Sequence, residues 1–329
     1  MPRRSLSRRG FLGGMAALGL VGGLAACGYR EEAPSGTGAT WTYTDDRGRV
    51  LDGPRPTRIV AQVTAAAALW EFGVRPVGIF GPATLPDGRP TSQAGAVDVA
   101  SVTSLGNVWG EFDFDAYVGL RPELLVSVVY QNDELWYVPA EQVDQVERAA
   151  PTVGVNLAGV PMLDAIGEFA DLAAALGADV QTPAVTDAKA AFERADQEFA
   201  AVVRERLSGQ RVLVTSATQD HLYVGEPNAF PSVKHLMQRG MPLVVPEQTT
   251  DSGYWEALSW ENAGKYPVDV ILLDSREGNL QADDLAAFPT WARLPAVRAG
   301  RVISWNMELP FSYRALATEL THLTDHLRT

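Results

Sequence analysis

The chain has 329 residues, of which 46% are hydrophobic and 20% are charged, a composition typical of globular proteins and long enough for two domains. Its formal net charge of −13 offers no basic field for phosphate groups, which argues against a nucleic-acid partner.

Residues 1–27 are predicted to be an export signal. The segment SRRGFL resembles the twin-arginine motif, and the apolar run behind it is too short and too rich in glycine to span a membrane comfortably. The run ends in LAAC, which resembles a bacterial lipobox and implies a diacylglycerol on Cys27 and a lipid anchor on the extracytoplasmic face of the cell membrane. An ordinary signal peptide is the alternative, but Cys27 is the only cysteine of the chain. Residues 28–40 are polar and rich in Gly, Pro and Ser, which predicts a flexible tether.

Residues 41–161 are predicted to form an N-terminal lobe. A hairpin over 41–51 comes first, and short apolar runs then alternate with helical patterns. This alternation indicates a mostly parallel sheet covered by helices on both faces. The strands are expected at 58–62, 76–80, 101–105, 124–130 and 152–156, and the helices at 65–72, 113–120 and 140–149.

Residues 162–209 are predicted to connect two lobes by helices, a first one over 162–177 and a long one over 183–209. Thr182 can cap the long helix, Pro183 suits its first turn and Gly209 suits the residue after its end. Its apolar residues recur at three- and four-residue steps, and its length is roughly 35 Å. We expect this helix to join the lobes rigidly.

Residues 210–329 repeat the alternating pattern and are predicted to form a C-terminal lobe. The fold class is therefore α/β, with two Rossmann-like lobes that have central, mostly parallel sheets, one long joining helix and a ligand cleft between the lobes. The strands are expected at 211–215, 221–224, 242–245, 268–273 and 301–305, and the helices at 232–238, 254–261 and 311–327.

The chain resembles the substrate-binding proteins of iron–siderophore and cobalamin ABC importers, from about residue 55 to 327. The most specific motif is WARLPAVRAGRV at 291–302, and weaker motifs lie at 58–73, 113–126 and 268–271. The resemblance implies a monomeric lipoprotein that captures a ferric siderophore and delivers it to an ABC permease and its ATPase. Iron enters only inside the siderophore, so no cofactor is expected. Cobalamin or haem binding, or a surface lipoprotein of this fold without transport, are the alternatives.

The resemblance also implies that one acidic residue on each lobe docks to the permease. These are Asp115 in the first lobe, where the family usually has Glu, and Glu261 in the second. Glu111 or Asp113 could take the place of Asp115. The alternative interpretation is that these acids only stabilise the first turns of helices.

The cleft is expected to be lined by aromatic residues, which offer large flat faces to a bulky chelate. Trp109 and Trp255 precede the two docking acids by six residues, a spacing at which related cobalamin binders have ligand-contacting tryptophans. Tyr130, Trp136 and Tyr137 follow a strand, where open α/β sheets bind ligands. The alternative is that these rings belong to the cores.

Charged ligand contacts are expected from Glu308, near a position where some family members place an acid, and from Arg314 at the start of the last helix. Arg89 and Arg276 are weaker candidates for binding an anionic chelate.

An enzyme is not expected, because the sequence has no G-x-S-x-G motif and no cysteine after Cys27. His322 and His326 lie four residues apart, but helix-terminal cations explain them better than a metal site.

Overall fold

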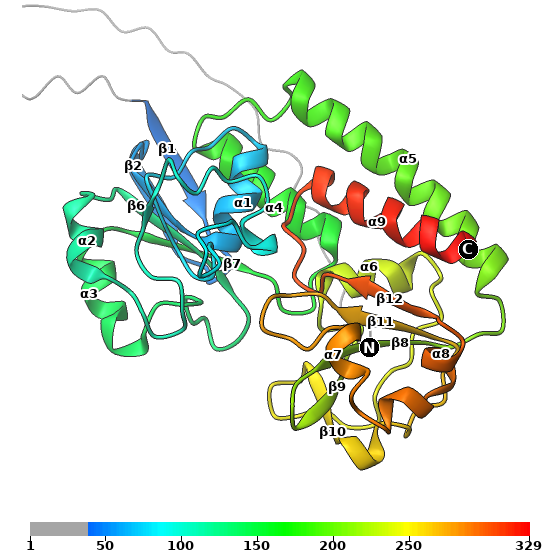
Figure 1. The fold of residues 1–329 in the computed structure, drawn as a ribbon. Coiled ribbons are helices and arrows are strands. Elements are labelled where there is room, and N and C mark those ends of the chain that lie inside the picture. The colour runs from blue at the N-terminus through cyan, green and yellow to red at the C-terminus, as the bar shows by residue number, and fades with distance from the viewer. Residues whose placement is uncertain (1–38) are drawn as a thin grey trace, which may run out of the picture. The chain divides into compact units, whose positions relative to one another are not determined.

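The computed structural model describes residues 39–329 (Figure 1). The predicted export signal, Cys27 and most of the predicted tether lie outside this range.

The first element is the hairpin that the sequence predicts. Strands β1 (Thr40–Thr44) and β2 (Val50–Pro54) pair antiparallel. The Asp45 carboxylate holds the turn by accepting the backbone N–H of Arg49 at 2.9 Å, and it also accepts the N–H of Gly154 at 3.0 Å. The hairpin is thereby attached to the sheet that follows.

Lobe 1, from β1 to β7, has a five-stranded parallel sheet in the order β5-β4-β3-β6-β7. Its strands are β3 (Ile59–Gln62), β4 (Gly78–Phe80), β5 (Thr103–Ser104), β6 (Leu124–Val129) and β7 (Thr152–Asn156). Its helices are α1 (Val63–Glu71), η1 (Ser92–Ala94), α2 (Phe114–Gly119), η2 (Ala140–Gln142) and α3 (Val143–Ala149). Leu124 and Val126 of β6 belong to a core shared with α1, whereas Leu125 faces the opposite core with Tyr117 and Val146 of α2 and α3. Helices therefore cover both faces, as predicted.

Lobe 2, from β8 to the C-terminus, has five strands in the order β10-β9-β8-β11-β12, of which β8, β11 and β12 are parallel. Its strands are β8 (Val212–Ala217), β9 (His221–Gly225), β10 (Trp255–Ser259), β11 (Val270–Asp274) and β12 (Val302–Trp305). Its helices are α6 (Pro231–Gln238), η3 (Trp260–Asn262), α7 (Ala282–Leu285), η4 (Trp291–Arg293), α8 (Pro295–Arg298) and α9 (Tyr313–Arg328).

The chain passes from β7 to β8 through two helices, α4 (Met162–Ala175) and α5 (Pro183–Arg206). The 24 residues of α5 correspond to about 36 Å. Thr182 caps this helix, with its side chain accepting the N–H of Val185, as the sequence predicts. Figure 1 shows α5 beside α9, which it contacts along its length.

The two sheets share one apolar core. Val126 of lobe 1 and Val214 of lobe 2 belong to the same contiguous cluster of buried side chains as Phe169 of α4 and Phe199 of α5. Each sheet thus contributes one face to a core that it shares with the connecting helices α4 and α5.

The helix predicted over 254–261 is wrong: this segment forms β10 and then the short η3. Glu256 and Leu258 are buried on one side of the strand and Ala257 is exposed on the other, which is a strand pattern. The Glu256 carboxylate accepts the hydroxyl of Tyr266 at 2.5 Å, and pairing with β9 satisfies the backbone.

The strand predicted over 242–245 is also wrong. The segment makes one isolated bridge, between Leu243 and Val212, the first residue of β8. Pro242 and Pro246 flank it, and neither can donate an N–H to a sheet.

Candidate functional site

A cavity of about 820 Å³, including its open mouth, lies between residues of lobe 1 and lobe 2; we call it the aromatic cleft. Tyr130 directly follows β6 and Met307 follows β12, so the cleft is at the carboxyl ends of strands from both sheets. Polar wall residues include Thr64, Gln131 and Ser232. The aromatic walls are made by Tyr130, Trp136, Phe230, Tyr254, Trp255 and Phe311.

The rings of this cleft contact one another across the two lobes. Tyr130 lies edge-on to Trp136 at 5.0 Å between centroids and to Tyr254 of lobe 2 at 6.1 Å. Phe230 continues the series, with centroids 5.1 Å from Tyr254 and 4.9 Å from Trp255. The cleft therefore offers edges and faces of rings from two sides to a flat or bulky ligand.

Trp109 lies outside the aromatic cleft. Its side chain is 57% exposed, and its ring meets the edges of Trp136 at 4.6 Å and Tyr137 at 5.1 Å. The loop that carries it begins at Gly106, where a Cβ would come within 2.0 Å of the Glu111 carbonyl oxygen. Trp109 thus supports the rings of the cleft from outside.

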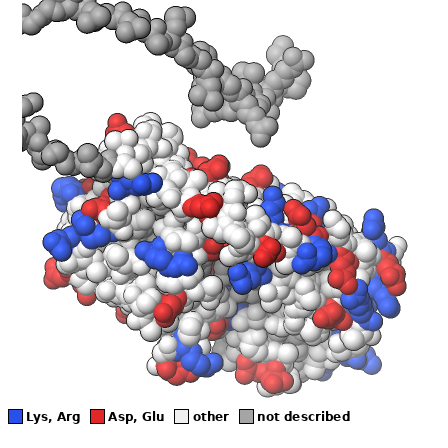
Figure 2. All heavy atoms as spheres, turned by 90° about the horizontal axis from the view of Figure 1, so that it is seen from above, with Lys and Arg blue, Asp and Glu red and all other residues white. Residues whose placement is uncertain are grey.

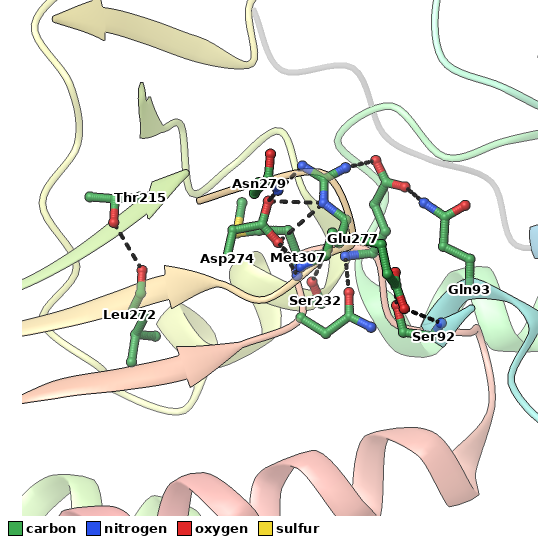
Figure 3. A network of polar contacts seen from close by, with 12 residues as sticks. Ser92, Gln93, Thr215, Ser232, Leu272, Asp274, Glu277, Asn279 and Met307 are labelled. Atoms are coloured by element: carbon green, nitrogen blue, oxygen red, sulfur yellow. Dashed lines mark hydrogen bonds and ion pairs between the residues drawn. The ribbon is translucent and has the colours of Figure 1, made fainter. Parts of the chain in front are cut away.

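A polar network follows β11 and links lobe 2 to η1 of lobe 1 (Figure 3). The Arg276 guanidinium donates to Oδ1 of Asp274 at 3.1 Å and to Oδ2 at 2.9 and 2.7 Å, and it also pairs with Glu308. Glu308 also accepts an N–H from the Gln93 side chain. The Asp274 side chain is fully buried, and Asn279 supplies it with a further donor at 2.8 Å.

The electrostatics of this network follow from its burial. Burial raises the pKa of Glu308, and the Arg276 charge opposes that rise. Burial disfavours the charge on Arg276, but Glu308 and Asp274 more than offset this and raise its pKa. Burial also raises the pKa of Tyr130, with Glu308 adding to the effect, so Tyr130 is a neutral hydroxyl.

The arginine that the sequence favoured for the cleft lies elsewhere. Arg314 lines a separate groove with Trp70, and its backbone N–H donates to the Glu71 carboxylate at 3.1 Å. The residues between β12 and α9 line the cleft before the chain reaches Arg314. Arg314 itself therefore lies outside the cleft for which the sequence favoured it. Arg89 is exposed and pairs with Asp87.

The two predicted docking acids are both exposed. Asp115 lies in the first turn of α2, where Asp113 provides the cap by accepting the N–H of Ala116. Glu261 lies on η3, where its own backbone N–H and Ser259 lower its pKa. On the face shown in Figure 2, acidic and basic side chains are interspersed, so neither sign dominates there.

The histidine pair lies in α9. The rings of His322 and His326 are 4.2 Å apart, and within residues 39–329 no group of three or more metal-ligating side chains is found.

Sequence reasoning missed several residues of the site. Phe230 and Tyr254 line the aromatic cleft, and Gln93 and Glu277 join the polar network. Phe230 directly precedes Pro231, the first residue of α6. A proline that can begin a helix is a sequence signal for the connection between a strand and a helix, and this signal could have pointed to Phe230.

The chain matches the family model of periplasmic binding proteins over residues 60–309. Among solved structures, the ferric-siderophore receptor protein DesE from Streptomyces coelicolor is 37% identical, with 88% of this chain and 98% of that chain covered and a TM-score of 0.82. The siderophore-binding protein FhuD from Vibrio cholerae, solved with Fe³⁺–Desferal, is 18% identical over 82% of this chain and 97% of that chain, with a TM-score of 0.61. A siderophore periplasmic binding protein from the fuscachelin gene cluster of Thermobifida fusca is 20% identical over 84% and 98%, with a TM-score of 0.60. These last two likenesses show the fold alone. A comparison with curated proteins gave no match. The chain belongs to the periplasmic binding protein family.

Proposed function

We propose that this protein captures a ferric siderophore in the aromatic cleft and delivers it to an ABC importer. The observation that carries the proposal is a cleft of about 820 Å³ whose aromatic walls come from both lobes. The 37% identity with a ferric-siderophore receptor supports the same ligand class.

The chemistry of this function is recognition, without catalysis. The chelator surrounds the iron, and the protein contacts the outside of the chelator. Trp136, Trp255 and Phe230 offer apolar surface. In the part of the chain that the structure describes, the Tyr254 hydroxyl is buried without a hydrogen-bond partner, although Tyr254 is one of the residues that line the cleft.

The charges of the site favour neutral or cationic chelates over strongly anionic ones. Arg276 contacts the cleft residue Glu308, and this arginine already pairs with both Asp274 and Glu308. A trianionic chelate would have to compete with both carboxylates and would approach the negative charge of Glu308.

Membrane attachment and delivery are part of the proposal. Lipidation of Cys27 would hold the protein at the extracytoplasmic face, with a tether of about a dozen residues before the folded part. None of the helices within residues 39–329 has the length and hydropathy needed to cross a bilayer. The exposed acids Asp115 and Glu261, one on each lobe, would dock to basic pockets of the permease while the protein acts as a monomer.

The test is a titration of the mature protein, monitored by tryptophan fluorescence, with ferric trihydroxamate, ferric tricatecholate, ferric citrate, cobalamin and haem. We expect quenching by a ferric hydroxamate at micromolar concentration or below, and weaker binding of the anionic chelates. Iron-free chelators serve as controls. Saturation by cobalamin or haem alone would move the assignment to those ligands, and flat titrations throughout would contradict the proposal.

A further inference from the structure

A second cavity adjoins the aromatic cleft and has a different chemical character; we call it the polar cavity. It also measures about 820 Å³ with its opening, and it shares Trp136 and Glu308 with the aromatic cleft. Its other walls include Gln93, Tyr137, Arg276 and Glu277. The two cavities therefore adjoin at these two side chains.

Two rings form a corner of the polar cavity. The planes of Trp136 and Tyr137 meet at 80°, with centroids 6.2 Å apart. Tyr137 has a φ of 68°, an unusual backbone conformation for a bulky residue, and its ring packs on Gly81. Such strain is retained where the position of a side chain matters. Perpendicular aromatic faces of this kind attract cations.

Two carboxylates line the same cavity as these rings. Glu277 accepts hydrogen bonds from the backbone N–H and the hydroxyl of Ser92, at 3.0 and 3.1 Å. Both donors are neutral, so they do not compensate the negative charge of the Glu277 carboxylate. Glu308 shares Arg276 with Asp274. With all groups ionised, the walls of the polar cavity carry one positive charge, on Arg276, and two negative charges, on Glu277 and Glu308, a net charge of −1; the buried Asp274 also pairs with Arg276. The polar cavity therefore combines aromatic faces with uncompensated negative charge.

We propose that the polar cavity binds an ammonium group carried by the ferric chelate, so that the protein selects chelates with a free amine arm. This inference rests on the proposed function, because the chelate centre would occupy the aromatic cleft. Trp136 and Tyr137 would face the ammonium group, and Glu277 and Glu308 would accept its hydrogen bonds.

The test compares two probes that differ only in this group: ferric desferrioxamine B, a linear trihydroxamate with one primary amine, and its N-acetylated derivative. The measured quantity is the ratio of their dissociation constants for each protein variant, from fluorescence titrations at low salt. We expect wild-type protein to prefer the amine form by about tenfold, the combined effect of a cation–π contact and partly exposed charge pairs. Glu277→Gln should reduce the ratio to about threefold or less.

Two control variants separate charge from loop position. Asp283→Asn removes an exposed acid of α7 that lies outside the walls of both cavities, and it should keep the wild-type ratio. Ser92→Ala removes the hydroxyl that contacts Glu277 but no charge, and it should keep the ratio too.

The outcomes are distinguishable. Equal affinities of wild-type protein for the two probes would overturn the inference while leaving the proposed function supported. A ratio that survives Glu277→Gln, or that Ser92→Ala abolishes equally, would also overturn it. Binding of neither probe would contradict the proposed function for trihydroxamates and this inference with it.

Discussion

Replacement of Arg276 by methionine tests the polar network most directly. The change keeps an unbranched, flexible stem but removes the cation shared by Asp274 and Glu308. Removing one partner of a buried ion pair costs about 3–5 kcal/mol, because the other charge stays buried. Arg276 is itself 20% exposed, and Asp274 keeps the donor of Asn279, so we expect the lower end of that range, about 3 kcal/mol.

The assay is urea denaturation at neutral pH, monitored by tryptophan fluorescence, with the free energy of unfolding compared at equal m-values. Arg89→Met is the matched control, because it breaks an ion pair whose side chains are 74% and 53% exposed, and it should leave the midpoint unchanged within error. If Arg276→Met destabilised the protein no more than Arg89→Met, the reasoning about the buried network would be refuted.

Other variants probe the ligand site, the anchor and the helix contacts. Trp255→Ala should weaken ferric-chelate binding about tenfold in titrations, whereas Glu261→Ala should slow uptake by cells and leave binding unchanged; equal loss of binding in both would contradict the division between cleft and docking surface. Cys27→Ser should move the protein from the membrane fraction to the soluble extracytoplasmic fraction, and retention in the membrane would argue against lipidation. Asp196→Asn should cost about 2 kcal/mol at neutral pH, because the Asp196 carboxylate of α5 bonds His235 of α6 at 2.8 Å. Burial opposes ionisation of Asp196, but its hydrogen bonds lower its pKa, so this contribution is complete above about pH 4 and is lost as the pH falls further; a deficit that stays constant down to pH 2 would contradict the assignment.

The elements that the sequence predicted well are those whose signals are local. Helix α5 begins at Pro183 behind its Thr182 cap, and β7 covers the predicted residues, because caps, prolines and periodicity act within a few residues. The errors are non-local. Strand β10 depends on its pairing with β9. The segment 254–261, with two acids, two tryptophans and a leucine, is compatible with a helix or a strand until that pairing is known.

The candidate site shows the same limit. Tyr130 and Trp136 could be found because they follow a buried strand, a position that topology brings to the ligand edge. The placement of Arg314 could not be predicted, because the path of the chain between β12 and α9 puts Arg314 in a separate groove, whereas Arg276, just after β11, lines the polar cavity. The motif around Trp291 carried the resemblance, but Trp291 is buried in the core of lobe 2 and marks the fold rather than the ligand.

The apolar cluster that runs from Val126 through Phe169 and Phe199 to Val214 has a mechanical consequence. A large rotation of one lobe against the other would expose this apolar core to water, at a free-energy cost comparable to that of unfolding. We therefore expect the two lobes to keep nearly the same relative placement whether or not the aromatic cleft holds a ligand.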